Sequence, residues 1–258
     1  MKRLILLILF IILCLPFHAS ALGPMMLLSG GGCIPETYES YWNGDDYPAD
    51  RDTAKSEGGC ATLDGTLTDA ATIINSPDVL DGYYLNLDGS NDSLSLPITA
   101  QDIFDSAQGS ISADVYLVND GTDSDAQIFE SCGQLTGSPD TTNRITLFIQ
   151  SADRMIKLEH KSNDAAWNKT STNAIPEDTR TTIKAAWDVA GNLHGQGATI
   201  KLGVKVGANA WEYGTATTAQ AFTNDPPVDI KWGETNGYNG NDVLYIDNAN
   251  SWVTTDES

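Results

Sequence analysis

The stretch that decides the fold class is residues 83–97, which read Tyr-Tyr-Leu-Asn-Leu-Asp-Gly-Ser-Asn-Asp-Ser-Leu-Ser-Leu-Pro. Apolar and polar side chains alternate on both sides of a cluster of turn-forming residues, a pattern that predicts two short strands, 83–87 and 93–96, joined as a β-hairpin. The alternation returns in 110–118, 144–150 and 155–160, and the last two of these flank a second turn cluster. The repetition indicates an all-β protein.

Further strands are expected where the same period of two recurs, at 127–130, 181–188, 199–206, 210–213, 228–233 and 243–253. The nearest candidate for a helical turn is 69–75. More than ten short strands with polar turns and little helix predict two stacked antiparallel sheets. No repeat of fixed period is present, which argues against a solenoid or a propeller.

Four segments, in this order, resemble the laminin-G-like, concanavalin A-like lectin/glucanase jelly-roll superfamily. Residues 84–97 resemble the first hairpin of that fold, 109–117 its next long core strand, 181–188 its central strand, and 243–249 its closing strand with an Ile-Asp pair. The resemblance covers residues 37–254. It implies an all-β, two-sheet antiparallel jelly-roll sandwich. The loop at 50–59 departs from the superfamily's usual Asp-, Ser- and Gly-Asn-Gly-rich run.

The first 21 residues have the composition of a signal peptide. Lys2 and Arg3 precede an apolar run at 4–17, and Ala19-Ser20-Ala21 provides a cleavage pattern. The run is too short to cross about 30 Å of hydrocarbon as a helix, and no later run reaches about 18 apolar residues. An uncleaved anchor is the alternative. We therefore expect a signal peptide at 1–21, a flexible Gly- and Pro-containing arm at 22–36, and one domain at 37–258. The mature protein is then secreted, to the extracellular space or the cell surface, with no transmembrane segment.

The large negative charge of the chain limits which molecules it can bind. Losing the signal removes two basic residues and no acidic one, so the formal charge changes from −21 to −23. Such a chain is unsuited to neutralising the phosphates of a nucleic acid, and an anionic membrane surface would repel it. A cation such as Ca²⁺ would be attracted to it.

Three cysteines are left after the signal, Cys33, Cys60 and Cys132. An oxidising compartment allows one disulfide among them, and we favour Cys60–Cys132, with Cys33–Cys60 as the main rival. Lipid attachment at Cys33 is disfavoured because that residue lies 16 positions beyond the apolar run.

The sequence provides no catalytic residues that we would assign. Glycan hydrolases of the resembled superfamily carry Glu-x-Asp-x-x-Glu, which is absent here. Glu177-Asp178 follows Pro176 in an expected turn. The Gly-x-Ser-x-Gly and His-Glu-x-x-His motifs are also absent, and His160 and His194 are expected in loops. The chain is therefore predicted not to be an enzyme.

Carbohydrate binding requires fewer specialised groups than catalysis does, namely a flat aromatic ring with amides and carboxylates nearby. Trp211 and Tyr213 lie on one side of a strand by the period of two, with core packing as the alternative. The glycine-rich loop at 236–242 contributes Tyr238, Asn239, Asn241 and Asp242, with an ordinary surface turn as the alternative.

A calcium ion is the other expected ligand. The resemblance implies a Ca²⁺ at the edge of the sandwich, and the oxygen ligands available to it are Asp88, Asn91, Asp92 and Asp247. Turn formation explains Asp88-Gly89 equally well.

The function favoured by these observations is a secreted, non-catalytic module that binds carbohydrate or another surface polymer. A structural or adhesion component of a surface layer, fibre or virion that self-associates is the alternative. A divergent glycan hydrolase or lyase is a third interpretation.

Overall fold

A computed structural model describes residues 40–42, 53–54, 65–68, 70–75, 79–80, 83–88, 92–96, 107–118, 125–135, 138–163, 165–191, 193, 199–216, 229–233 and 243–252. The chain divides into two compact units, residues 1–32 and 33–258, and every described residue belongs to the second. The predicted signal peptide at 1–21 and arm at 22–36 lie outside the described residues.

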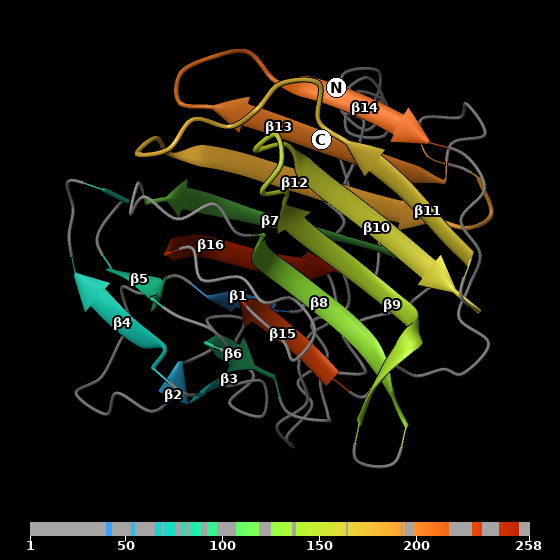
Figure 1. Ribbon diagram of the computed structural model, residues 1–258, viewed down its shortest axis with the longest axis horizontal. Helices are drawn as coiled ribbons and strands as arrows, with labels where there is room; N and C mark the ends of the chain where they lie inside the picture. The colour runs from blue at the N-terminus through green and yellow to red at the C-terminus, as the bar shows by residue number, and fades with distance from the viewer. Residues whose placement is uncertain are drawn as a thin grey trace, which may run out of the picture. The chain divides into compact units, whose positions relative to one another are not determined.

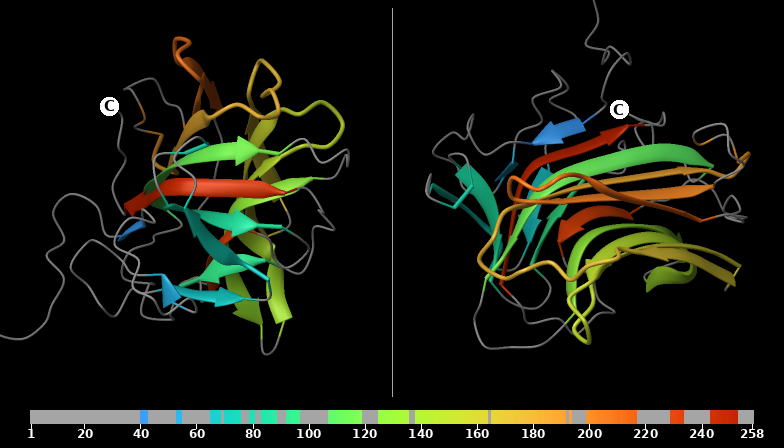
Figure 2. Two further views of the ribbon diagram at one scale, coloured as in Figure 1. Left: turned by 90° about the vertical axis from the view of Figure 1, so that its left-hand side faces the viewer. Right: turned by 90° about the horizontal axis from the view of Figure 1, so that it is seen from above.

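The described strands form two antiparallel sheets, which Figures 1 and 2 show packed face to face. Sheet A has the order β14 (Glu212–Ala216), β13 (Ile200–Val206), β12 (Thr181–Asp188), β7 (Gln108–Leu117), β16 (Leu244–Trp252), β5 (Tyr83–Leu87) and β4 (Thr72–Asn75), and β1 (Ser40–Trp42) pairs with β16. Sheet B has the order β11 (Ala165–Thr170), β10 (Ile156–Ser162), β9 (Ser138–Ile149), β8 (Ala126–Leu135), β15 (Asp229–Gly233), β6 (Ser93–Ser95), β3 (Gly65–Thr68) and β2 (Thr53–Ala54). The predicted all-β, two-sheet antiparallel sandwich is confirmed.

Alternation along the strands builds the sandwich. In β12, Ile183, Ala185 and Trp187 are buried, while Thr182 and Lys184 on the other face are partly exposed. One face of each such strand is therefore apolar and must be covered by the facing sheet, about 10 Å away.

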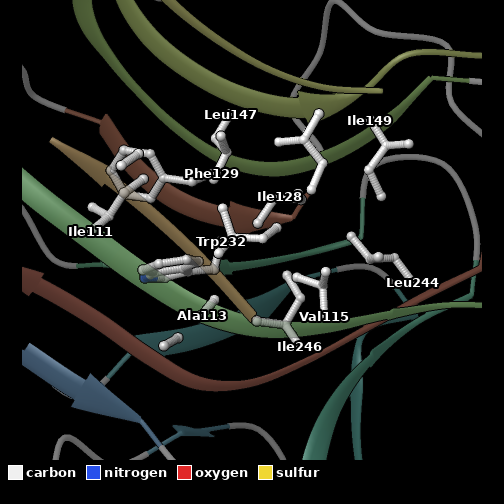
Figure 3. Close-up of a cluster of buried hydrophobic side chains, with 14 of the residues drawn as sticks. Ile111, Ala113, Val115, Ile128, Phe129, Leu147, Ile149, Trp232, Leu244 and Ile246 are labelled. Carbon is white, nitrogen blue, oxygen red and sulfur yellow. The ribbon is translucent and has the colours of Figure 1, made fainter. Parts of the chain in front are cut away.

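The core lies between the sheets (Figure 3). Ile111, Ala113 and Val115 enter it from β7 in sheet A, and Phe129 and Trp232 enter it from sheet B. The rings of Phe129 and Trp232 pack edge to face with centroids 5.0 Å apart. Because each fully buried large apolar side chain contributes about 1.5–3 kcal/mol, this interface dominates the stability of the fold.

The predicted hairpin at 83–96 is wrong, although both of its strands form. β5 pairs with β4 and β16 in sheet A, whereas β6 pairs with β3 and β15 in sheet B. Leu87 of β5 and Leu94 of β6 face the same core from opposite sheets. The chain therefore crosses between sheets at the point where the turn chemistry indicated a reversal within one sheet.

The second predicted hairpin is confirmed, since β9 pairs with β10 from Ile156 opposite Ile149 to Lys161 opposite Arg144. The candidate helical turn at 69–75 is wrong, because β4 occupies its second half and pairs with β5. Three consecutive β-branched residues, Thr72, Ile73 and Ile74, fit a pleated strand better than a helix. The sequence contains no pattern from which we predicted β1, β2, β3 or β11.

Candidate binding site

Trp211 and Tyr213 lie on the outer face of sheet A, at its β14 edge. Tyr213 is directly opposite Gly203 of β13, which is in turn opposite Lys184 of β12. A Cβ on Gly203 would lie 2.7 Å from Tyr213 Cε1 and 3.5 Å from Trp211 Cε3. The missing side chain at Gly203 is therefore what lets the two rings lie against the sheet.

The two rings form a stacked pair. Their centroids are 5.6 Å apart and their planes differ by 19°. Tyr213 is 48% exposed and Trp211 is half-buried, so neither belongs to the core of the sandwich. Core packing, the alternative explanation for these residues, does not hold for the exposed Tyr213. Offset stacking of this kind contributes about 0.5–1.5 kcal/mol beyond burial, which holds the rings in place.

Lysines border the aromatic pair. Lys201 Nζ is 4.8 Å from the centroid of Tyr213, and Lys184 Nζ is 5.5 Å from that of Trp211. Lys205 follows on β13, on the same face as Lys201 and Gly203. We name the set Lys184, Lys201, Lys205, Trp211 and Tyr213 the aromatic–lysine patch. A cation over an exposed ring contributes about 0.5–1 kcal/mol, little enough for a ligand to displace it.

Glu212 anchors the strand that carries the two rings. Its side chain points away from them, and its carboxylate accepts hydrogen bonds from the backbone N–H of Thr172 and, at 2.9 Å, from Asn173 Nδ2. Burial raises the pKa of Glu212, but the hydrogen bonds from Thr172 and Asn173 outweigh it and hold the pKa below its ordinary value. The ionised carboxylate thus ties β14 to the segment between β11 and β12.

The other residues predicted to bind sugar cannot be placed. Tyr238, Asn239, Asn241 and Asp242 all lie outside the described residues. The lysines of the patch were not anticipated. A period-two signal for Lys184 was present in the alternation of 181–188, but its position beside Trp211 depends on strand register.

Of the predicted calcium ligands, the structure brings Asp88 and Asp92 together and places Asp247 apart from them. Asp92 is buried, and its carboxylate accepts the backbone N–H of Ala70 and of Asp88, each at 2.9 Å. Asp247 lies beyond the pair Ile246–Leu85, at least three residues or about 10 Å along the strand from Asp88. It is opposite Asp114 of β7 instead. Asn91 lies outside the described residues, which hold no group of three or more His, Cys, Asp or Glu side chains placed to share a metal ion.

Burial raises the pKa of Asp92, and the neighbouring Asp88 raises it further, against the lowering effect of the two backbone hydrogen bonds. The hydrogen bonds of this carboxylate have a structural role. They connect the turn between β3 and β4 with the point where the chain leaves β5.

Cys132 is buried in β8. Cys60, its predicted disulfide partner, lies outside the described residues, as does Cys33. The pairing of the cysteines therefore stays a prediction.

The side chains that the sequence offered as possible acids and bases contact other partners or lie far from one another. Glu177 accepts a hydrogen bond from Arg154 at 2.9 Å. Burial raises the pKa of Tyr116, and the charge of Asp178 raises it further. Glu177 and Asp178 therefore face different partners. His160, expected in a loop, is instead fully buried in β10, opposite Ile145 of β9.

Comparison with known proteins defines the fold. No protein-family model matches the chain, and no curated protein sequence is significantly similar to it. Among solved structures, the binding domain of Paraclostridial Mosquitocidal Protein 1 matches with a TM-score of 0.58 and 12% identity, over 84% of this chain and 49% of that one. The binding domain of botulinum neurotoxin serotype D matches with a TM-score of 0.55 and 9% identity, over 84% and 48%.

A third match is a structure of botulinum neurotoxin type C, which depends upon interaction with two ganglioside molecules to get into cells. Its TM-score is 0.55 and its identity 9%, over 86% of this chain and 49% of that one. The chain thus spans about half the length of the structures it matches. At these identities the likeness shows the fold, which is the concanavalin A-like lectin/glucanase jelly roll expected from the sequence.

Among the described residues, no helix is both long and apolar enough to cross a membrane.

Proposed function

We propose that this protein is a secreted, non-catalytic module that binds carbohydrate, or another extracellular polymer, through the aromatic–lysine patch. The observation that carries the proposal is the exposed ring of Tyr213, stacked on Trp211. Apolar ring faces pack on the C–H faces of pyranoses, and the loss of conformational freedom on binding is small for side chains with two rotatable bonds.

The surroundings of the rings support this function. Gly203 provides the space beneath them, and the hydrogen bonds of Glu212 hold the strand on the opposite face. A ligand site gains affinity when its groups are ordered before the ligand arrives. A stacked, anchored pair of rings at the edge of a rigid sheet satisfies that condition.

The comparisons support the same class of function. Two of the matched structures are binding domains, and a third is of a neurotoxin whose cell entry depends on interaction with gangliosides, which carry saccharides. The remaining parts of the proposal rest on the sequence. Export rests on the basic, apolar and Ala-x-Ala segments of residues 1–21, and the exclusion of nucleic acid rests on the formal charge of −21. Calcium, through Asp88, Asn91, Asp92 and Asp247, is a subsidiary proposal.

A glycan array tests the proposal. Protein produced from the full chain is applied with Ca²⁺ and with EDTA. Binding to at least one class of saccharide is expected, and Tyr213→Ala and Trp211→Ala should each weaken it by about tenfold or more, the effect of truncating a central aromatic contact. Ile74→Ala is the matched control, because Ile74 is an exposed apolar side chain on β4, at the opposite edge of sheet A.

Several outcomes would contradict the proposal. Silence on every saccharide class would count against carbohydrate as the ligand, and equal losses in the patch variants and in Ile74→Ala would count against the patch. Loss of binding in EDTA would support the calcium site, while unchanged binding would remove it. Size-exclusion chromatography of the same protein tests self-association, and a large assembly with no glycan binding would favour the structural alternative.

A further inference from the structure

A second pair of stacked rings lies on the outer face of sheet A, formed by Tyr116 of β7 and Tyr245 of β16. The two residues are directly opposite each other, with ring centroids 5.8 Å apart and planes that differ by 10°. Both side chains are partly exposed, whereas the next residues along each strand, Leu117 and Ile246, are buried in the core. The buried ring of Tyr84 packs against Tyr245 with centroids 4.6 Å apart and holds the pair in place.

This second pair shares one face of one sheet with Trp211 and Tyr213. The register of β14, β13, β12 and β7 places Trp211 level with Asp114, and Tyr116 is two residues further along β7. Trp211 and Tyr116 are therefore about 14 Å apart across the strands and about 7 Å along them, a separation of about 16 Å. Tyr245 lies one strand beyond, as the order of strands in Figure 1 shows.

The polar groups between the two pairs are bound to one another. The buried carboxylate of Asp114 accepts hydrogen bonds from the hydroxyl of Thr182 and from the guanidinium of Arg180, each at 2.5 Å. Thr182 and Arg180 are themselves partly exposed. A ligand that crosses this surface therefore meets groups whose positions are already fixed, and its binding does not depend on any charged side chain being free.

We infer that the ligand is a linear, neutral oligosaccharide that occupies both ring pairs, with Tyr116 and Tyr245 as a second subsite. This inference rests on the proposed function. A single sugar ring covers one pair and does not bridge about 16 Å, whereas a chain of several linked rings does. The formal charge of −21 disfavours a polyanion of that length, and stacking on tyrosine and tryptophan rings requires no charge on the ligand.

The two subsites differ in accessibility. Tyr213 is 48% exposed and is the more accessible ring, so a disaccharide binds first at Trp211 and Tyr213. A longer chain bound there carries its far end to Tyr116 and Tyr245 at a high effective concentration. Linking two weak contacts in this way raises affinity by a factor of about 100 or more without any new type of contact.

A chain-length series tests the inference. Linear neutral oligosaccharides of glucose, mannose, galactose and xylose, each from the disaccharide to the octasaccharide, are titrated into protein produced from the full chain. Affinities are measured by isothermal titration calorimetry. In at least one series the octasaccharide should bind about 100-fold more tightly than the disaccharide, and affinity should stop rising once the chain spans both ring pairs.

Aromatic variants locate the two subsites. Tyr245→Ala should weaken octasaccharide binding about tenfold and leave disaccharide binding unchanged, while Tyr213→Ala should weaken both. Tyr245→Phe keeps the ring and should bind like the wild type. Ile74→Ala is the matched control, because Ile74 is exposed on β4, two strands beyond Tyr245. Thermal melting of each variant verifies folding.

The outcomes separate this inference from the proposed function. Equal affinity for disaccharide and octasaccharide, unchanged octasaccharide binding in Tyr245→Ala, or equal losses in Tyr245→Ala and Ile74→Ala would overturn the inference and leave carbohydrate binding intact. Binding of saccharides on the glycan array without binding of any member of the four series would overturn the neutral chain as the ligand. Failure of all saccharides to bind would overturn the proposed function, and this inference with it.

Discussion

Replacing Asp92 with alanine should destabilise the sandwich at the corner where the chain crosses from sheet A to sheet B. The carboxylate of this buried residue accepts the N–H of Ala70 and the N–H of Asp88, each at 2.9 Å. Alanine leaves both donors without that acceptor. Hydrogen bonds to a charged group contribute about 1.5–3 kcal/mol each, so two of them bound the loss at about 3–6 kcal/mol.

Two effects reduce that loss. Ala70 and Asp88 are exposed, so water can partly replace the carboxylate, and burial raises the pKa of Asp92, which shows that ionisation carries a desolvation cost. We therefore expect a decrease of about 2–4 kcal/mol in the free energy of unfolding. For a domain of this size the melting temperature falls by about 2–4 °C per kcal/mol.

The pH dependence has a definite sign. A carboxyl whose pKa is raised by folding binds its proton more tightly in the native state, so its contribution to stability falls as pH rises from about 3.8 through the folded pKa. The loss caused by Asp92→Ala should accordingly be larger at the acid end of that window than at neutral pH.

Urea denaturation followed by tryptophan fluorescence measures the effect, in Ca²⁺ and in EDTA. Asp88→Ala is the companion variant. It keeps the backbone N–H that Asp92 accepts and removes only the neighbouring carboxylate that raises the pKa of Asp92, so it should lower stability much less than Asp92→Ala does. A decrease in the free energy of unfolding below about 1 kcal/mol for Asp92→Ala, or a decrease seen in Ca²⁺ alone, would refute this structural role of the two hydrogen bonds. It would favour Asp92 as a metal ligand instead.

Three further predictions concern sheet A. Gly203→Ala should displace Tyr213, because the new Cβ would lie 2.7 Å from the ring, and should weaken saccharide binding about tenfold while denaturation changes by less than about 1 kcal/mol. Glu212→Gln should lower stability by about 1 kcal/mol at neutral pH. Because the pKa of Glu212 is lowered, this difference should vanish as pH falls from 4.5 through the folded pKa, and a constant difference across an acid titration would contradict the assignment. Arg180→Met removes the guanidinium that lies 2.5 Å from the buried carboxylate of Asp114. Allowing for the partial exposure of Arg180, the free energy of unfolding should fall by about 1–3 kcal/mol. Stability equal to that of the wild type in urea would show that the ion pair contributes nothing.

Local alternation was sufficient to predict individual strands. β5 and β12 have the bounds expected from their sequences, and the other strands between β7 and β16 that were expected differ at their ends. The long core strands are well predicted because one face of each must be apolar. β11 has the sequence Ala-Ala-Trp-Asn-Lys-Thr and is largely exposed at the edge of sheet B, so it carries no apolar period to recognise.

The assignment of strands to one sheet or the other was harder to predict from the sequence than the strands themselves. In a two-sheet sandwich, β5 and β6 both present alternating apolar side chains to one core, and the turn residues between them suit a hairpin and a crossing equally well. The carboxylate of Asp92 joins the crossing to the turn between β3 and β4, a contact between residues 22 positions apart. Local sequence patterns do not encode such a contact.

The candidate site was predictable in part. The period of two placed Trp211 and Tyr213 on one side of a strand, but that side is exposed only because β14 forms the edge of sheet A with the rings directed outward. Lys184 and Lys201 join them through the register of β12, β13 and β14. Register depends on pairing between strands, so the patch became visible only in the folded structure.

Backbone amide chemical shifts recorded during titration with the best-binding saccharide test the central claim most directly. We predict that the largest changes fall on the amides of Lys201, Gly203, Glu212 and Tyr213 and on the indole N–H of Trp211, with little change across sheet B. Changes concentrated on sheet B, or spread evenly over the protein, would contradict the claim that the aromatic–lysine patch is the binding site.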